Sequence, residues 1–258
     1  MKFFAKIATA AAVIMAVSGV AQAKEWTKVR IGTEGAYPPF NFFDSNNELQ
    51  GFDIDIAKEL CSRMKVECTF VAQDWDGIIP ALLANKYDAI IASMSNTEER
   101  RKKVDFTDKY YQTPARFIAA KTSDVKDTSP EALAGKTLGA QSSTIHANYL
   151  EDKYKNSTVK LYATQDEANL DLASGRLDAV LADSVVLYEW ISKTEDGKCC
   201  DFVGDSYNEE KYFGAGAGIA IRQGETDLAD MFNKALAEIR ADGTYDKINA
   251  KYFPFSIY

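Results

Sequence analysis

LANKYDAIIAS at residues 83–93 and LASGRLDAVLAD at residues 172–183 are similar, with one residue inserted in the second stretch. Each combines a helix end, a basic residue and an apolar strand that begins Asp-Ala. The repeat predicts two lobes of related architecture, although a common helix–strand connection could also have arisen twice independently. Ligands of open α/β sheets bind beyond the carboxyl ends of the strands. Ser93 and Asp183, at the two strand ends, are therefore expected to face one another across a cleft.

Strand and helix patterns alternate on both sides of the repeat. Apolar residues recur at helical spacing from Phe52 to Met64. Such alternation favours an α/β fold whose sheets are mostly parallel and covered by helices on both faces. The predicted strands are 28–34, 69–71, 87–93, 106–111, 136–141, 158–162, 177–183 and 212–218, and the predicted helices are 52–64, 78–85, 143–153, 166–173, 185–192, 227–241 and 245–252.

The first residues have the order of a secretory signal. Lys2 and Lys6 flank the charged start, residues 7–20 are almost wholly apolar, and Ala-Gln-Ala at 21–23 supplies small residues. A membrane anchor is the alternative, but the apolar run is shorter than the ~20 residues that span a bilayer. We predict a signal peptide over 1–23 that is cleaved after Ala23, and a periplasmic product.

The formal charge of the chain is −8. An acidic surface is a poor partner for nucleic acid or for anionic lipid, so neither is expected as a partner. The same charge mildly favours the approach of a cationic ligand, although salt screens this attraction beyond ~8 Å.

The four cysteines fit an oxidising compartment. Cys61 and Cys68 flank a predicted helix-to-strand turn, so a local disulfide is expected. Cys199 and Cys200 are adjacent, and their state stays open. A zinc site is the alternative, but His146 is the only histidine and no C-x-x-C spacing occurs. No metal and no cofactor are expected.

Hydroxyl groups and cations follow Ser93. Backbone N–H groups and hydroxyls at a strand-to-helix turn suit a carboxylate ligand. Thr97 also fits a helix N-cap, and the cationic run 100–103 is typical of a solvated face. Arginine is the side chain that binds a carboxylate with two parallel hydrogen bonds. Spacing alone does not select Arg100 from the run.

Several motifs, in their order along the chain, resemble those of the periplasmic amino-acid-binding proteins of ABC importers. The resemblance is strongest to the lysine/arginine/ornithine-, histidine- and arginine-binding members of solute-binding protein family 3. It implies two α/β lobes joined by a two-strand hinge, with lobe 1 at 24–112 and 211–258 and lobe 2 at 113–210. The motifs are IGTEGAYPPF (31–40), GFDIDIA (51–57), residues 88–100, FTDKYY (106–111), GRLDA (175–179), YFG (212–214) and ADGTY (241–245).

The resemblance also implies the ligand-binding residues. The implied contacts are Arg100 with Ser95, Ser143 and Thr144 for the ligand α-carboxylate, Asp183 with Ser93 for the α-ammonium, Tyr37 and Trp75 as aromatic walls, and Glu34 for the distal end of the side chain. The alternatives are that Tyr37 and Trp75 are core aromatics, that Glu34 is a surface carboxylate, and that Asp183 is a helix N-cap.

A cationic amino acid is the expected ligand, arginine first, with lysine, ornithine and histidine possible. Ala92 and Ile145 depart from the family pattern, and an opine is an alternative ligand. A secreted dehydratase-type enzyme shares this scaffold, but His146 is expected at an exposed or capping position, and no catalytic triad is recognised. The resemblance further implies a monomer that docks on a membrane permease/ATPase complex.

Overall fold

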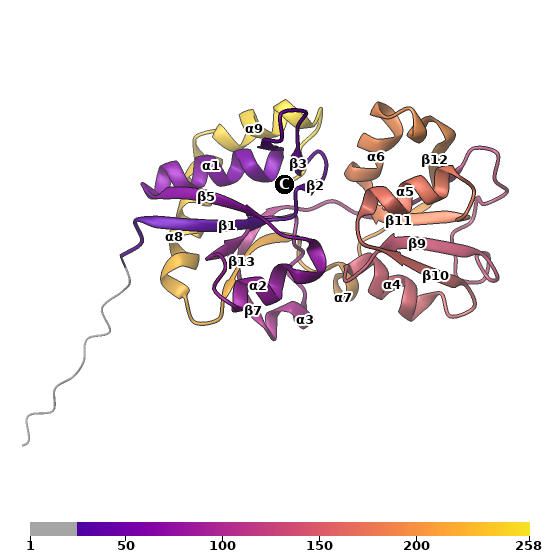
Figure 1. Cartoon of the computed structure of the whole chain (residues 1–258), viewed down its shortest axis with the longest axis horizontal. Helices are drawn as coiled ribbons and strands as arrows, with labels where there is room; N and C mark the ends of the chain where they lie inside the picture. The colour runs from indigo at the N-terminus through magenta and orange to yellow at the C-terminus, as the bar shows by residue number, and fades with distance from the viewer. Residues whose placement is uncertain (1–24) are drawn as a thin grey trace, which may run out of the picture.

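The structure, a computed structural model, describes residues 25–258 as two lobes, each built on a five-stranded sheet (Figure 1). The predicted signal peptide over 1–23 and its cleavage site lie outside the described residues. The sheet of the first lobe contains, in spatial order, β5 (Glu67–Ala72), β1 (Lys28–Thr33), β6 (Ala89–Ile90), β13 (Ala217–Arg222) and β7 (Val104–Tyr111). The sheet of the second lobe contains β10 (Thr158–Tyr162), β9 (Thr137–Gln141), β11 (Ala179–Asp183), β8 (Ala115–Ala120) and β12 (Cys200–Tyr207).

Both sheets have the same pairing pattern. The first three strands of each order are parallel, and the last two pair antiparallel. The two-lobed α/β fold is therefore confirmed, and β6 and β11 from the repeated sequence occupy the same central place. Each sheet is mostly parallel, as expected, because only one of its five strands runs against the others, β13 in the first lobe and β8 in the second.

The repeated Asp-Ala has the same structural task in both lobes. Asp88 Oδ2 accepts the backbone N–H of Arg30 at 2.9 Å, and Asp178 Oδ2 accepts that of Thr137 at 2.7 Å. Each carboxylate thus binds an N–H at the start of the neighbouring parallel strand. In both lobes the repeated aspartate thus ties the central strand to its parallel neighbour.

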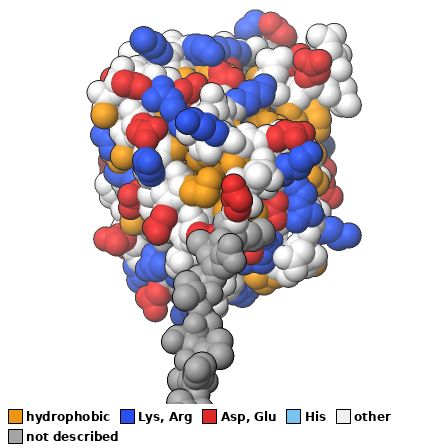
Figure 2. All heavy atoms as spheres, turned by 90° about the vertical axis from the view of Figure 1, so that its left-hand side faces the viewer, with side chains coloured by type: hydrophobic (Ala, Val, Ile, Leu, Met, Phe, Trp, Pro, Cys, Tyr) orange, Lys and Arg blue, Asp and Glu red, His pale blue; other side chains and the backbone are white. Residues whose placement is uncertain are grey.

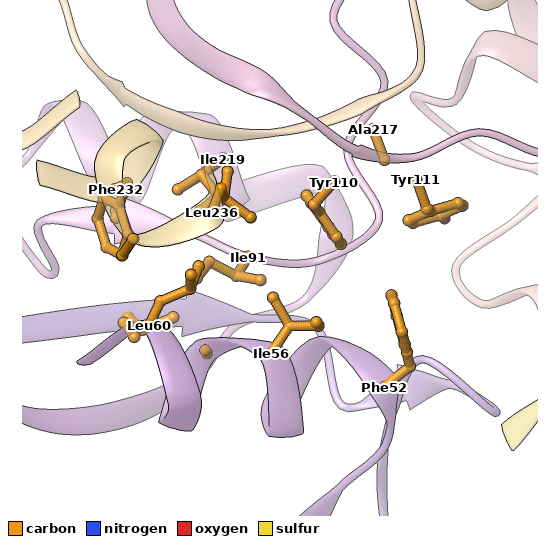
Figure 3. Packing of buried hydrophobic residues seen from close by; sticks show 14 of the residues in the cluster. Phe52, Ile56, Leu60, Ile91, Tyr110, Tyr111, Ala217, Ile219, Phe232 and Leu236 are labelled. Carbon is orange, nitrogen blue, oxygen red and sulfur yellow. The ribbon is translucent and has the colours of Figure 1, made fainter. Parts of the chain in front are cut away.

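One face of the first sheet carries the larger core. In Figure 3, Ile56 and Leu60 of α1 point towards Ile91 and Leu236, and Phe52 points towards Tyr110 and Tyr111. The predicted apolar face of this helix is therefore buried as expected. The helices that cover this face are α1 (Phe52–Met64), α8 (Thr226–Ala241) and α9 (Thr244–Tyr252). The helices on the other face are η1 (Trp75–Gly77), α2 (Ile78–Leu83) and α3 (Glu98–Arg101). A small sheet adjoins α1 and consists of β2 (Ala36–Tyr37), β3 (Asn41–Phe43) and β4 (Leu49–Gln50).

The second lobe is covered on both faces as well. A cluster that contains Leu172 and Trp190 packs on one face, and a cluster that contains Tyr149 and Leu150 packs on the other. The helices of the first face are α5 (Gln165–Ala173), α6 (Ser184–Lys193) and η2 (Asp196–Cys199), and those of the second are α4 (Ile145–Lys153) and α7 (Glu210–Phe213).

Two expected strands differ from the structure. Residues 212–218 were expected as one strand, but the chain forms α7, and β13 begins only at Ala217. The Tyr212 and Phe213 rings pack on Tyr149, with centroids 5.0 and 5.1 Å away, and Gly214 ends the helix with φ 71°. The strand expected at 87–93 is paired only at 89–90, and Ser93 has φ 54°. The predicted lobe limits stay predictions.

All four cysteines form disulfides. The expected Cys61–Cys68 bond is confirmed, and Cys199 is bonded to Cys200, a pairing that the sequence left open. These thiols are therefore not available as zinc ligands. Among residues 25–258, no group of three or more His, Cys, Asp and Glu side chains is arranged to hold a metal ion.

The end of the first lobe carries charges of both signs. Figure 2 shows Lys and Arg side chains interspersed with Asp and Glu over this face, around an apolar area. Within residues 25–258, no helix combines the length and the apolar character that a membrane crossing requires.

Candidate ligand-binding site

A cavity lies between the two lobes, with about 690 Å³ of empty volume that includes its opening to solvent. Ser143 does not line it and lies in the wall of a neighbouring groove. The other residues that the sequence singled out do line it: Glu34, Tyr37, Trp75, Ser93, Ser95, Arg100, Thr144 and Asp183.

Arg100 brings an unpaired cation to the cavity. Thr97 caps its short helix, with Oγ1 accepting the Arg100 N–H at 3.3 Å. One guanidinium nitrogen, Nη1, donates to the Ser95 carbonyl at 3.1 Å, and Cζ lies 5.2 Å from the Trp75 ring centroid. Burial lowers the pKa of Arg100 to about 10, which leaves it cationic at neutral pH. No ion pair within residues 25–258 involves this guanidinium.

Asp183 brings an unpaired carboxyl group to the opposite lobe. Its Oδ1 accepts the backbone N–H of Val185 at 2.8 Å, so it is the N-cap of α6. Its Oδ2 accepts the Thr113 hydroxyl. Burial raises the pKa of Asp183 to about 6, although the hydrogen bonds oppose this shift. The N-cap position and the cavity position therefore coexist in one side chain, and no cation pairs with it in the described part of the chain.

Glu34 extends from the end of β1 to the second lobe. The side chain is 8% exposed, and its Oε1 accepts a 2.5 Å hydrogen bond from Gln141 Nε2. Burial, together with Asp74 and Asp76, raises the pKa of Glu34 to about 7. The alternative of an exposed surface carboxylate at Glu34 is wrong, since the carboxyl group is buried and faces the cavity.

Two aromatic side chains of the first lobe line the cavity. The Trp75 side chain is 8% exposed, and its Nε1 donates to the Ser143 carbonyl at 3.0 Å. The Tyr37 ring stacks on Phe40, with centroids 6.2 Å apart. Both side chains thus pack against a hydrophobic cluster of the first lobe and also line the cavity.

Ser93 is held by a buried carboxyl group. Its N–H donates to the Tyr110 hydroxyl at 3.0 Å, and its Oγ donates to Asp53 Oδ2 at 3.0 Å. Tyr110 and Asn41 also donate to Asp53, each at 2.8 Å. The network orders Ser93 in its left-handed conformation at the cavity wall.

Three consecutive residues of the second lobe bind the first lobe. Besides the bonds of Gln141 and Ser143, the Ser142 hydroxyl donates to the Asp76 carboxylate, with Oγ 2.8 and 3.0 Å from its two oxygens. These contacts join the lobes along one side of the cavity. Residue 143 therefore contributes through its backbone carbonyl, and its hydroxyl has no hydrogen bond among the described residues.

The sequence missed two polar residues of the cavity. Gln141 ends β9, so the same carboxyl-end rule that selected Ser93 could have found it. His146 was expected to be exposed or capping, and this was wrong: its side chain is 7% exposed and lines the cavity. Thr144 is the N-cap of α4, with Oγ1 accepting the Ala147 N–H at 3.1 Å. The histidine therefore lies inside the helix and not at its cap.

A family model and individual relatives agree on the protein family that this chain resembles. The model of the bacterial extracellular solute-binding proteins, family 3, matches residues 29–255. The L-arginine-binding protein of Pseudomonas aeruginosa is 47% identical over 232 residues, which cover 89% of each chain. The lysine/arginine/ornithine-binding periplasmic protein of Escherichia coli is 44% identical, again with 89% of each chain covered.

A solved structure has the same fold. An ancestral arginine-binding protein bound to arginine superimposes with a TM-score of 0.82 and 39% sequence identity. The match covers 88% of this chain and 98% of that one. The two-lobed fold is thus shared over nearly the whole described chain.

Proposed function

The chain belongs to the bacterial extracellular solute-binding proteins, family 3, and from that membership we propose that it captures a cationic amino acid for an ABC importer. We take arginine as the first candidate, ahead of lysine, ornithine and histidine. The protein would act in the periplasm, after removal of its signal peptide. It would deliver its ligand to a permease/ATPase complex in the membrane. The names of its relatives support this proposal.

The charges of the cavity carry the proposal. Arg100 provides one cation, and Asp183 and Glu34 provide two carboxyl groups, none of them in an ion pair within residues 25–258. A cationic amino acid has one carboxylate and two positive groups. The two sets are complementary in sign and number, whereas a neutral amino acid would leave Glu34 without a charged partner.

The charges of a bound amino acid must be paired by charges of the protein, because burying an unpaired charge costs free energy. A zwitterion that leaves water must have both charges hydrogen-bonded and paired, or desolvation outweighs the attraction. We infer that Arg100 holds the α-carboxylate and that Asp183, with Ser93, holds the α-ammonium. A guanidinium that reaches Glu34 along Trp75 would gain ~0.5–2 kcal/mol of cation–π attraction.

The ligand would also act on the shape of the protein. Arg100 and Glu34 belong to the first lobe and Asp183 to the second, so a bound zwitterion contacts both. A ligand that binds the closed form more tightly shifts the population towards it. Closure would present a distinct shape to the permease.

A ligand screen tests the proposal directly. The mature protein is mixed with each standard amino acid and ornithine, and its thermal unfolding is followed, because ligands that bind the folded state raise Tm. We expect arginine, lysine or ornithine to give the largest increase, and calorimetry then to give Kd. A larger increase with glutamine or an acidic amino acid than with every cationic one would contradict the proposal.

Glu34→Gln is expected to change ligand choice. The variant keeps a hydrogen-bonding side chain of the same size but loses the charge that faces the distal cation. Arginine affinity should fall about 10–100-fold, the range for a hydrogen bond to a charged group. Glutamine affinity should change less than about threefold. An equal loss for both ligands, measured by calorimetry, would remove Glu34 from the distal subsite.

The same carboxyl group predicts a pH dependence. A cationic ligand stabilises the ionised form of Glu34, and the pKa of Glu34 in the free protein is about 7. Arginine binding should therefore release protons and weaken as the pH falls from 8 to 6. Arginine itself does not titrate in this interval. Calorimetry in two buffers of different ionisation enthalpy measures the release, and Glu34→Gln should reduce it. A wild-type affinity that is constant over this interval would contradict the assignment.

A further inference from the structure

His146 lies in the first turn of α4, on the side that lines the cavity. The side chain is 7% exposed. Its ring packs against Phe213, with centroids 6.1 Å apart and planes inclined by 48°. Arg100 is close enough to act on its charge. The histidine thus shares a corner of the cavity with the guanidinium.

Neither ring nitrogen of His146 has a hydrogen bond to any of residues 25–258. Buried polar side chains almost always have a partner, because leaving one unpaired costs free energy. The Thr144 hydroxyl, two residues earlier, is by contrast fully engaged with the Gln141 carbonyl at 2.7 Å and the Ala147 N–H at 3.1 Å. Because His146 lines the cavity, its ring nitrogens are free to form a hydrogen bond with a molecule bound there.

The charge of the ring follows from its surroundings. Burial, together with the positive charge of Arg100, lowers the pKa of His146 to about 3. The ring is neutral at pH 7 and offers one N–H donor and one acceptor. A second cation beside Arg100 would repel it, whereas a neutral ring adds a donor without that cost.

The start of α4 favours an anion in the same corner. Thr144, Ile145 and His146 all line the cavity, and the first N–H groups of a helix have no partner within it. The N-terminal end of the helix dipole also attracts negative charge. Guanidinium, helix start and histidine together form a set of donors that suits one carboxylate.

We propose that His146 is a ligand-binding residue that donates a ring N–H hydrogen bond to the carboxylate held by Arg100. The proposal rests on the proposed function, since it assigns a donor to the α-carboxylate of the amino-acid ligand. A carboxylate accepts about four hydrogen bonds, so it can take the two of a guanidinium and this third one. The interaction makes residue 146 a determinant of affinity for the carboxylate end, independent of the side chain of the ligand.

Two variants separate a hydrogen-bonding role from a packing role. His146→Leu keeps an apolar side chain against Phe213 but has no donor, whereas His146→Gln keeps an N–H donor. Arginine affinity, measured by calorimetry at pH 7.5, should fall about 10–100-fold in the leucine variant and less than about threefold in the glutamine variant. Tyr149→Phe is the matched control, because Tyr149 lies on the same helix but does not line the cavity. Equal affinity in wild type and His146→Leu would overturn the proposal.

A spectroscopic test does not depend on any variant. His146 is the only histidine of the chain, so the ¹⁵N imidazole signals of the untagged mature protein belong to it alone. We expect the pattern of one neutral tautomer at pH 6, and a shift of the protonated nitrogen when arginine saturates the site. A histidine that does not respond to saturating arginine would overturn the proposal. If wild-type protein bound no amino acid at all, the proposed function itself would fail instead.

Discussion

Arginine affinity is expected to fall by about 3–5 kcal/mol in Arg100→Ala, which is a factor of roughly 100 or more in Kd. The α-carboxylate would enter the cavity without a charge partner, and breaking a buried ion pair leaves the remaining charge uncompensated. No other arginine or lysine lines the cavity within the described part of the chain. Calorimetry against arginine measures the loss.

Arg101→Ala is the matched control for Arg100→Ala. Arg101 lies on the same short helix, is exposed, and donates from Nη1 to Asn96 Oδ1 at 2.7 Å without lining the cavity. Its replacement should change Kd by less than about twofold, as expected for an exposed contact. A loss below about tenfold in Arg100→Ala would remove Arg100 from the site.

Asp183→Asn is expected to weaken arginine binding about 100-fold or more, because the α-ammonium would lose its negative partner. Asparagine has nearly the same shape and is itself a good N-cap, so the start of α6 should be retained. The free protein should unfold at a similar temperature. Calorimetry and thermal unfolding of the same samples separate the two effects.

Asp178→Asn controls for damage to the strand. Asp178 precedes the other end of β11, where it accepts the Thr137 N–H, and it does not line the cavity. This variant is expected to bind arginine with unchanged affinity. If Asp183→Asn bound arginine as tightly as wild type, the ammonium subsite would have to lie elsewhere.

Much of the fold could be predicted because its signals are local. The helix over 52–64 follows from apolar spacing, and the repeat at 83–93 and 172–183 correctly indicated two lobes with related central strands. Each Asp-Ala serves a hydrogen bond between neighbouring strands. The local disulfide between Cys61 and Cys68 was likewise predictable from a separation of seven residues.

Other parts could not be predicted because they depend on distant partners. The strand expected at 212–218 became a short helix, since Tyr212 and Phe213 pack on Tyr149, more than sixty positions earlier in the chain. His146 was expected to be exposed or capping, yet it is buried beside Phe213 and Arg100. The helix or strand propensity of a segment gives no information about the residues that pack against it from distant parts of the chain.

The sequence by itself determined which residue types the site can use and where their strands end. It placed an arginine after the strand of the first lobe and an aspartate at the end of β11 in the second, and it supplied the acidic side chain at position 34. Only the tertiary structure decided which of these charges remain without an ion-pair partner. Glu34 and Gln141 meet although 107 positions separate them, and Arg100 forms no ion pair among the described residues. The pairing of a charge and its burial depend on every group that surrounds it in space, whereas a sequence pattern contains only its neighbours along the chain.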